Sequence, residues 1–400
     1  MRQIARIIST YSADVFGVCS ALFELGGMII MHDASGCNST YTTHDEPRWY
    51  DMDSMVYISG LSEMEAIMGD DEKMIGDIAA AAEDLHPKFI AIAGTPIPAM
   101  TGFDYDSVAY LIEQRTGIPT FGFPTTGMNT YVHGASMALE GYARRFVNRN
   151  VEKTEHLSAN ILGLTPLDFT VNGCDDSIAA FLEKSGFEVV SRWAMGSTPE
   201  ELAEAGRAHV NLVVSSTGLG VAKALYEMFG TPYVIGLPYG ETASEKLARI
   251  LKRAAESGNC SIENAMEPDR DTSEYRNDGM WAGWSDLPGG EIVVIGEGIT
   301  SLALASAVEQ TTGKGVKVLC ATECEETLLR AKDKITLDEE EIEEELAGAA
   351  VLIADPLYRP ICPKETRFIP LPVEAFSGRI FREEIPNLAE MFESWAEHVK

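Results

Sequence analysis

Cys37 is the residue of this 400-residue chain whose surroundings point most directly to chemistry. It follows the apolar run 28–31 by way of Gly36, and residues 38–47 after it have the composition of a loop that enters a short helix. A thiolate at the start of a helix is stabilised by the positive end of the helix dipole, which lowers its pKa and favours metal binding. The alternative is that Cys37 is a small buried thiol at the end of a strand. The residue and its loop alone leave both interpretations open.

The elements that must position this cysteine follow one pattern along the whole chain. Apolar runs typical of strands alternate with amphipathic helical runs, as in parallel α/β units. We predict three doubly wound, Rossmann-like parallel-sheet units over residues 1–155, 156–285 and 286–400. In such folds, ligands gather at the carboxyl ends of the strands. The loops expected there carry Cys37, Thr95, Ser215 and Asp355.

Composition and charge exclude several classes of partner. The chain has 31 Lys and Arg against 62 Asp and Glu, a net charge of −31, whereas nucleic acids and anionic membranes attract basic proteins. No stretch reaches the length of a membrane span, and the first residues lack the apolar core of a secretory signal. We therefore expect a cytoplasmic protein that binds neither nucleic acid nor membrane. Its negative charge would serve either solubility or the binding of a basic partner protein.

Two further motifs lie in the last third of the chain. Cys320 and Cys324, four residues apart after a strand, could face a metal from one helix, or they could be part of the core. Residues 296–301 read Gly-Glu-Gly-Ile-Thr-Ser and join a strand to a helix, as a dinucleotide-binding turn does. The third glycine is replaced by Ser301, however, and no convincing acidic ribose ligand follows at the right distance. The flexible turn itself explains the glycines equally well.

Four segments in a fixed order carry a resemblance to a known family. Residues 17–37, 41–47, 59–73 and 96–108 resemble the first domain of nitrogenase component 1 proteins, with the second segment most similar to their beta-type subunit. The resemblance implies the three-unit fold predicted above. It also implies an iron-sulfur cluster at a subunit interface, with Cys37 as a metal ligand and Gly36 and Thr95 at the cofactor.

The chain departs from the family at the positions that matter for metal. Family members usually place three cysteines per subunit around the cluster, and here the first and third positions correspond to about Thr10 and to Thr95. An iron-sulfur cluster generally requires about four thiolates. One cysteine per subunit therefore implies that the cluster is lost, or that it uses oxygen ligands or the cysteines of a partner.

A second family landmark is the cysteine that anchors the large metal cofactor of true nitrogenase alpha subunits. The matching run here ends in Ser215 and Ser216, and the C-terminal part offers no matching histidine. Hydroxyls are poor ligands for soft metal centres. We keep Ser215 and Ser216 as cofactor-binding candidates and do not expect this chain alone to reduce dinitrogen.

The resemblance leaves two functional classes. The first is a subunit of a nitrogenase-like oxidoreductase, a homodimer or a heterotetramer with a related subunit, which receives electrons from an ATP-dependent iron-sulfur reductase. In that class His32, His44 and Glu46 are candidate proton-handling groups, although His44 could instead have a structural role beside Glu46. The second class is a cluster-free binding or cofactor-assembly scaffold with the same fold. Neither the substrate nor the identity of the partner subunit can be derived from the residues.

Overall fold

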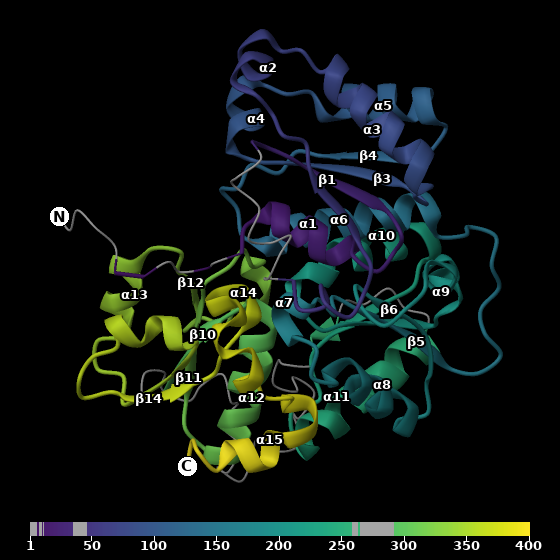
Figure 1. Cartoon of the computed structure of the whole chain (residues 1–400). Helices are drawn as coiled ribbons and strands as arrows, with labels where there is room; N and C mark the ends of the chain where they lie inside the picture. The colour runs from purple at the N-terminus through teal and green to yellow at the C-terminus, as the bar shows by residue number, and fades with distance from the viewer. Residues whose placement is uncertain (1–5, 8–9, 11, 35–45, 258–262, 265–291) are drawn as a thin grey trace.

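The computed structural model describes residues 6–7, 10, 12–34, 46–257, 263–264 and 292–400. Its strands form three separate sheets, one in each third of the chain, and every strand pair is parallel (Figure 1). Helices cover both faces of these sheets. The predicted fold, three doubly wound parallel-sheet units, is therefore confirmed.

The first sheet has the strand order β2-β1-β3-β4. Its central strands are continuous apolar runs with no exposed residue, as expected of parallel strands covered on both faces. The strands are β1 (Met28–His32), β2 (Met55–Ile58), β3 (Ile90–Gly94) and β4 (Thr120–Phe123). The helices are α1 (Asp14–Leu22), α2 (Glu63–Met68), α3 (Glu72–Leu85), α4 (Pro96–Thr101), α5 (Tyr105–Thr116) and α6 (Tyr131–Phe146).

The second sheet has the equivalent order β6-β5-β7-β8-β9. Its strands are β5 (Ser158–Leu162), β6 (Glu188–Trp193), β7 (Val210–Val213), β8 (Tyr233–Ile235) and β9 (Glu263–Asn264). Its helices are α7 (Pro166–Phe169), α8 (Cys174–Lys184), α9 (Pro199–Ala203), α10 (Leu219–Phe229) and α11 (Glu241–Ser257), with short 3-10 turns at η2 (Ala205–Arg207) and η3 (Ser216–Gly218).

The third sheet has a different order, β12-β11-β10-β13-β14. Its strands are β10 (Ile292–Gly296), β11 (Val316–Cys320), β12 (Lys334–Ile335), β13 (Val351–Ala354) and β14 (Arg367–Pro370). Its helices are α12 (Gly298–Thr312), α13 (Glu339–Glu345), α14 (Glu374–Ser377) and α15 (Leu388–Ala396), with 3-10 turns η5 (Glu326–Leu328), η6 (Pro356–Ile361) and η7 (Gly378–Glu384).

The three units share a continuous apolar core. One cluster of buried side chains runs from Val15 in α1 through the second sheet to Val399 near the C-terminus. Helix α6 lies against both α1 and α10 and so joins the first unit to the second (Figure 1). The α1–α6 crossing requires glycine, because a methyl group at Gly134 would come within 1.8 Å of the Asp14 carbonyl oxygen. The units therefore pack as one body.

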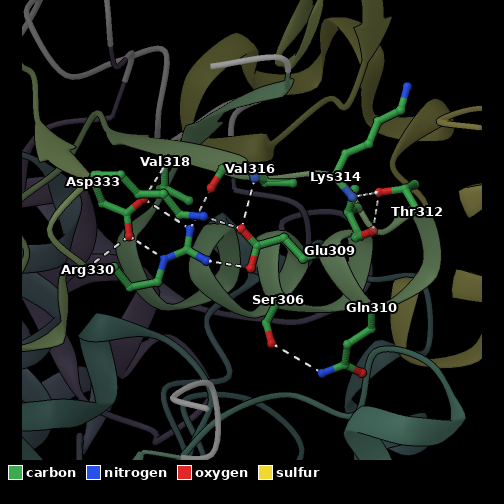
Figure 2. A network of polar contacts seen from close by, with 11 residues as sticks. Ser306, Glu309, Gln310, Thr312, Lys314, Val316, Val318, Arg330 and Asp333 are labelled. Carbon is green, nitrogen blue, oxygen red and sulfur yellow. Dashed lines mark hydrogen bonds and ion pairs between the residues drawn. The ribbon is translucent and has the colours of Figure 1, made fainter. Parts of the chain in front are cut away.

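A buried ion network holds the edge of the third unit together (Figure 2). The Arg330 guanidinium lies between Glu309 of α12, at 3.1 Å, and Asp333, at 2.6 Å. The two carboxylates also accept the backbone N–H groups of Val316, at 2.9 Å, and Val318, at 2.8 Å. The network therefore fixes helix α12 and the segment before β12 to strand β11.

Candidate functional site at the junction of the three units

The loops at the carboxyl ends of the sheets meet at the junction of the three units, where carboxylates link one unit to another. The first link joins units one and two. The Tyr131 hydroxyl, at the start of α6, donates a short hydrogen bond to Asp168 of α7. Thr165, which caps α7, donates a second bond of 2.8 Å to the same carboxylate. Asp168 is thus held by hydroxyl donors and has no basic partner among the described residues around it.

The second link joins units two and three. Glu297, only 2% exposed, accepts the backbone N–H of Ser216 at 3.0 Å and the Ser216 hydroxyl. The same carboxylate caps helix α12 by accepting the N–H groups of Ile299 at 3.0 Å and Thr300 at 2.9 Å. Because a carboxylate at a helix N-terminus is favoured by the dipole, this buried charge is stabilised without a cation.

The third link joins units one and three. Glu323, in the loop after β11, accepts the backbone N–H of Thr130 at 2.8 Å and the Thr130 hydroxyl. The neighbouring carbonyl of Ala321 accepts the Thr10 hydroxyl at 3.1 Å. Each pair of units is therefore tied by a different carboxylate.

A small cavity of about 60 Å³ lies beside these links, between units two and three. Asp168, Cys174, Tyr239 and Glu297 contribute polar groups to its wall. Burial, together with the nearby Glu297 carboxylate, raises the pKa of Asp168 from 3.8 to about 7. Burial and the same carboxylates hold the pKa of Tyr239 well above its usual value. The cavity can thus hold a small polar group beside a carboxyl that exchanges protons near neutral pH.

The predicted candidates Ser215 and Ser216 both lie at this junction. The Ser215 hydroxyl donates to the Gly163 carbonyl at 3.0 Å and contacts Thr217, so it shapes the turn after β7. The Ser216 hydroxyl is bound to Glu297. Both hydroxyls are therefore engaged within the protein.

His32 and Thr95 come together at the carboxyl ends of β1 and β3. The Thr95 hydroxyl donates to the His32 carbonyl at 2.9 Å, and His32 Nδ1 lies 2.9 Å from the Ser59 hydroxyl. The imidazole also packs on Phe103, with 4.3 Å between ring centres. Burial lowers the pKa of His32 to about 4, so the ring is neutral at pH 7. A neutral imidazole in this position can accept or relay a proton but carries no resting charge.

Glu46 is completely buried and forms an ion pair with Arg48, whose Nε lies 2.6 Å away. The same guanidinium binds Glu24 at 2.8 Å and lies 4.8 Å from the centre of the Phe23 ring. This geometry is that of a structural ion pair, and a proton-handling role for Glu46 stays a prediction. Gly36, Cys37 and His44 lie outside the described residues.

The Gly-Glu-Gly turn at 296–301 does join a strand to a helix, as the sequence predicts. However, the Glu297 carboxylate occupies the N–H groups of the first turn of α12 that would bind a pyrophosphate. The geometry therefore argues against dinucleotide binding at this turn.

Of the two interpretations of Cys320 and Cys324, a pair facing a metal from one helix is wrong, and core packing is confirmed, since Cys320 is part of the apolar core and Cys324 packs against it. Cys320 ends strand β11, and Cys324 lies in the loop that follows. The loop forms because Thr130 and Lys223 of other units bind its two glutamates, Glu323 and Glu325.

Sequence reasoning missed the acidic residues that define the junction. Glu297 lies inside a motif that resembles a nucleotide-binding turn, and its acidic side chain at a helix N-cap was the available signal. Asp168 comes shortly after a strand and three residues after the capping residue Thr165, and this position at the carboxyl end of a strand was the available signal for it. Tyr131, Tyr239 and Cys174 carry no local signal, because only the packing of distant segments brings them to the cavity.

The described residues do not fit a metal centre held by this chain alone. Within them, no group of three or more His, Cys, Asp or Glu side chains is arranged to bind a metal ion. Thr10 and Thr95, which the resemblance aligns with cluster cysteines, use their hydroxyls for bonds to backbone carbonyls. Iron-sulfur clusters select thiolates, which these positions lack. Over the same residues, no helix is long and apolar enough to cross a membrane.

The chain is similar to two curated proteins and to one solved structure. It is 25% identical over 290 residues to the nitrogenase iron-molybdenum cofactor biosynthesis protein NifE of Rippkaea orientalis, a match that covers 70% of this chain and 60% of that protein. It is 29% identical over 187 residues to a light-independent protochlorophyllide reductase subunit of Leptolyngbya boryana, covering 46% of this chain and 36% of that protein. The matches thus span 60% or less of the length of these curated relatives. A solved nitrogenase structure, Nitrogenase Cp1 at pH 6.5, shares the fold with a TM-score of 0.71 at 16% identity, over 100% of this chain and 93% of that one.

The family profile for nitrogenase component 1 type oxidoreductases matches residues 14–353, which include the strands and helices of all three units up to β13. The expectation drawn from the four segments is thereby confirmed: this chain belongs to the nitrogenase component 1 type oxidoreductase family.

Proposed function

We propose that this chain is one subunit of a nitrogenase-like oxidoreductase that receives electrons from an ATP-dependent iron-sulfur reductase and reduces a substrate other than dinitrogen. Reductions of this kind consume protons together with electrons. The observation that carries the proposal is Asp168, a carboxyl with a pKa of about 7 at the wall of the junction cavity. Near neutral pH it is protonated in about half of the molecules and can deliver that proton to a group in the cavity.

Tyr131 orients this proton donor. Its hydroxyl binds one oxygen of Asp168, and Thr165 binds the other, so rotation of the carboxyl is restricted. The Tyr239 ring forms another part of the cavity wall. The neutral His32, five residues before Cys37 in the chain, supplies a second group able to accept a proton, at the carboxyl end of the first sheet.

The proposal excludes dinitrogen as substrate because Ser215 and Ser216 stand where the resemblance places the cofactor-anchoring cysteine. The family's large metal cofactor would need a thiolate at this position, and the Ser216 hydroxyl is bound to Glu297. An iron-sulfur cluster at a subunit interface would likewise need thiolates of the partner in addition to Cys37, because the Thr10 and Thr95 hydroxyls are committed to backbone carbonyls. In this proposal the metal centre is therefore shared with, or supplied by, the second subunit.

A partner subunit is supported by an apolar surface on the first unit. Helix α2 has no buried residue, yet it presents Met64 (66% exposed), Ile67 (70%) and Met68 (70%), and it packs beside α4, where Met100 is 80% exposed. A short helix with a bare apolar surface is typical of an interface. A related subunit, identical or sister, is the occupant that we propose for this surface.

A cluster-free scaffold or assembly subunit is the second candidate. The observation that favours it is the closed junction, in which Ser216 and Glu297 fill the place of the cofactor-anchoring cysteine. One of the relatives, NifE, is itself named as a cofactor biosynthesis protein. A scaffold of this kind would bind a partner or a small ligand and carry no electrons itself.

Iron and acid-labile sulfide analysis of the anaerobically purified chain, alone and with its co-expressed partner subunit, separates the two candidates. The oxidoreductase proposal predicts iron and sulfide at no more than one cluster per dimer, and loss of that iron in Cys37→Ala. Cys362→Ala is the matched control, because Cys362 is a partly buried thiol in the third unit, far along the chain from Cys37. A colourless preparation after anaerobic reconstitution, with and without partner, would reject the oxidoreductase proposal in favour of the scaffold. Full iron content in Cys37→Ala would remove Cys37 from the ligands.

A further inference from the structure

Two free thiols meet in the loop after strand β11. Cys320 is the last residue of the strand and is completely buried, whereas Cys324 is partly exposed. In the sheet, Cys320 pairs with Gly296 of strand β10, which ends two residues before Gly298. The second thiol is also in contact with helix α12, since a methyl group at Gly298 would come within 2.5 Å of the Cys324 sulfur. Both cysteines thus lie against the same short segment, residues 296–298, and Cys324 packs against the apolar cluster to which Cys320 belongs.

The two thiols differ in their readiness to react. The interaction with the Cys324 thiol, together with burial, raises the pKa of Cys320 and keeps it a thiol. Cys324 is partly exposed at the protein surface and can be reached by a small reagent. This difference is typical of a pair in which the accessible cysteine reacts first and the buried one resolves the product.

The loop between the two cysteines and the segment beside it contain buried hydroxyl groups without hydrogen-bond partners in the described part of the chain. The Thr322 hydroxyl is fully buried and, among the described residues, has no hydrogen-bond partner. The Thr336 hydroxyl is also buried and has no hydrogen-bond partner among the described residues. Thr336 lies next to the loop, because its backbone N–H donates to the Cys320 carbonyl at 2.8 Å. Buried polar groups without partners are unfavourable. A rearrangement of this loop would therefore cost less free energy than in a loop whose buried polar groups all form hydrogen bonds.

We propose that Cys320 and Cys324 form a reversible intraloop disulfide on reaction with a small-molecule disulfide such as oxidised glutathione. The Cys324 thiolate attacks one sulfur of the oxidant, which forms a mixed disulfide and releases one thiol. The Cys320 thiol then loses its proton and attacks the Cys324 sulfur, which closes the ring and releases the second thiol. Two protein thiols are oxidised and one small disulfide is reduced to two thiols.

Oxidation also changes the junction of the three units. Ala321 and Glu323, between the two cysteines, accept the bonds from Thr10 and Thr130 of the first unit. Ring closure draws the Cys324 sulfur away from Gly298 and towards Cys320, and this displaces Glu323. The reduced chain therefore has a tight junction between units one and three, and the oxidised chain a looser one.

Peptide mapping tests the chemistry on the full chain. The protein is equilibrated anaerobically with mixtures of reduced and oxidised glutathione, alkylated in denaturant and digested with trypsin. Cleavage after Lys317 and Arg330 gives the peptide 318–330, which contains Cys320 and Cys324 and no other cysteine. We expect this peptide to lose two hydrogen atoms and both alkylation sites under oxidising mixtures, and to recover them with dithiothreitol. Cys324→Ser should abolish the change, and Cys362→Ser should leave it intact.

Hydrogen exchange tests the consequence. The Thr130 amide, which donates to Glu323, should exchange at least about tenfold faster in the oxidised protein, while the amides of strand β5 keep their rates. Double alkylation of peptide 318–330 at every glutathione ratio would overturn the proposal, and so would a stable glutathione adduct on Cys324 without ring closure. Unchanged exchange at Thr130 in a protein that does form the disulfide would refute the loosening of the junction.

Discussion

Asp168→Asn should change the dependence of stability on pH. The folded protein raises the pKa of Asp168 from 3.8 to about 7, so it holds this proton more tightly than the unfolded chain does. Between these values the folded state is protonated and the unfolded state is ionised, and stability must fall as pH rises. One pKa unit corresponds to about 1.4 kcal/mol, which gives an upper bound of roughly 4 kcal/mol. Because Asp168 is only partly buried and faces a cavity, we expect less than this bound, roughly 1–3 kcal/mol.

The asparagine variant cannot ionise, so it lacks this loss. Its free energy of unfolding, measured in urea at several pH values from 5 to 8, should rise relative to the wild type by roughly 1–3 kcal/mol across the range, because only the two pH units between 5 and the folded pKa of about 7 contribute. Asp106→Asn, on the exposed face of α5, is the matched control and should give a curve parallel to the wild type. Parallel curves for Asp168→Asn would show that the carboxyl is already ionised at pH 5 and would refute the proton-donor argument.

Three further predictions follow from buried contacts. Arg330→Met should destabilise the third unit by about 3–5 kcal/mol in urea, because it leaves the buried Glu309 carboxylate with less compensation. Gly298→Ala should cost about 1–3 kcal/mol in the same assay by displacing the Cys324 sulfur, and Cys324→Ala in the same chain should recover most of it. His32 should show ring carbon-bound proton signals in NMR that do not move between pH 8 and about 6, because burial lowers its pKa to about 4.

Each of these has its own control. Arg144→Met removes exposed ion pairs with Glu140 and Glu227 and should cost less than about 1 kcal/mol. An Arg330→Met variant as stable as Arg144→Met would mean that the network of Figure 2 contributes nothing. A Gly298→Ala loss that persists without the Cys324 sulfur would assign the cost to the backbone. A His32 signal that titrates near pH 6.5 would place the ring in solvent.

The fold could be predicted because its signals are local. Each central strand, such as 90–94 or 292–296, is an unbroken apolar run beside a helical run, and parallel sheets follow from that alternation. The order of the third sheet, with β10 at its centre, could not be read in this way. It depends on which neighbour each strand selects after the chain has folded.

The junction could be predicted only in part. Ser215, Ser216 and Thr95 were predicted because the resemblance aligns them with cysteines of the family, and all three lie at the carboxyl ends of strands. Asp168 and Glu323 were not found, because their partners Tyr131 and Thr130 are 37 and 193 residues away in the chain. A contact of that kind has no periodicity or spacing to recognise.

The closed ring of links through Asp168, Glu297 and Glu323 has a consequence for access. Each carboxylate ties a different pair of units, so moving one unit away from another strains the links to the third unit as well. The three links therefore cannot be broken one after another at low energy. A molecule larger than the cavity of about 60 Å³ beside these links could therefore enter only after more than one link has opened. Entry to the interior should accordingly be selective by size and slow for anything large, whichever reaction the assembled complex performs.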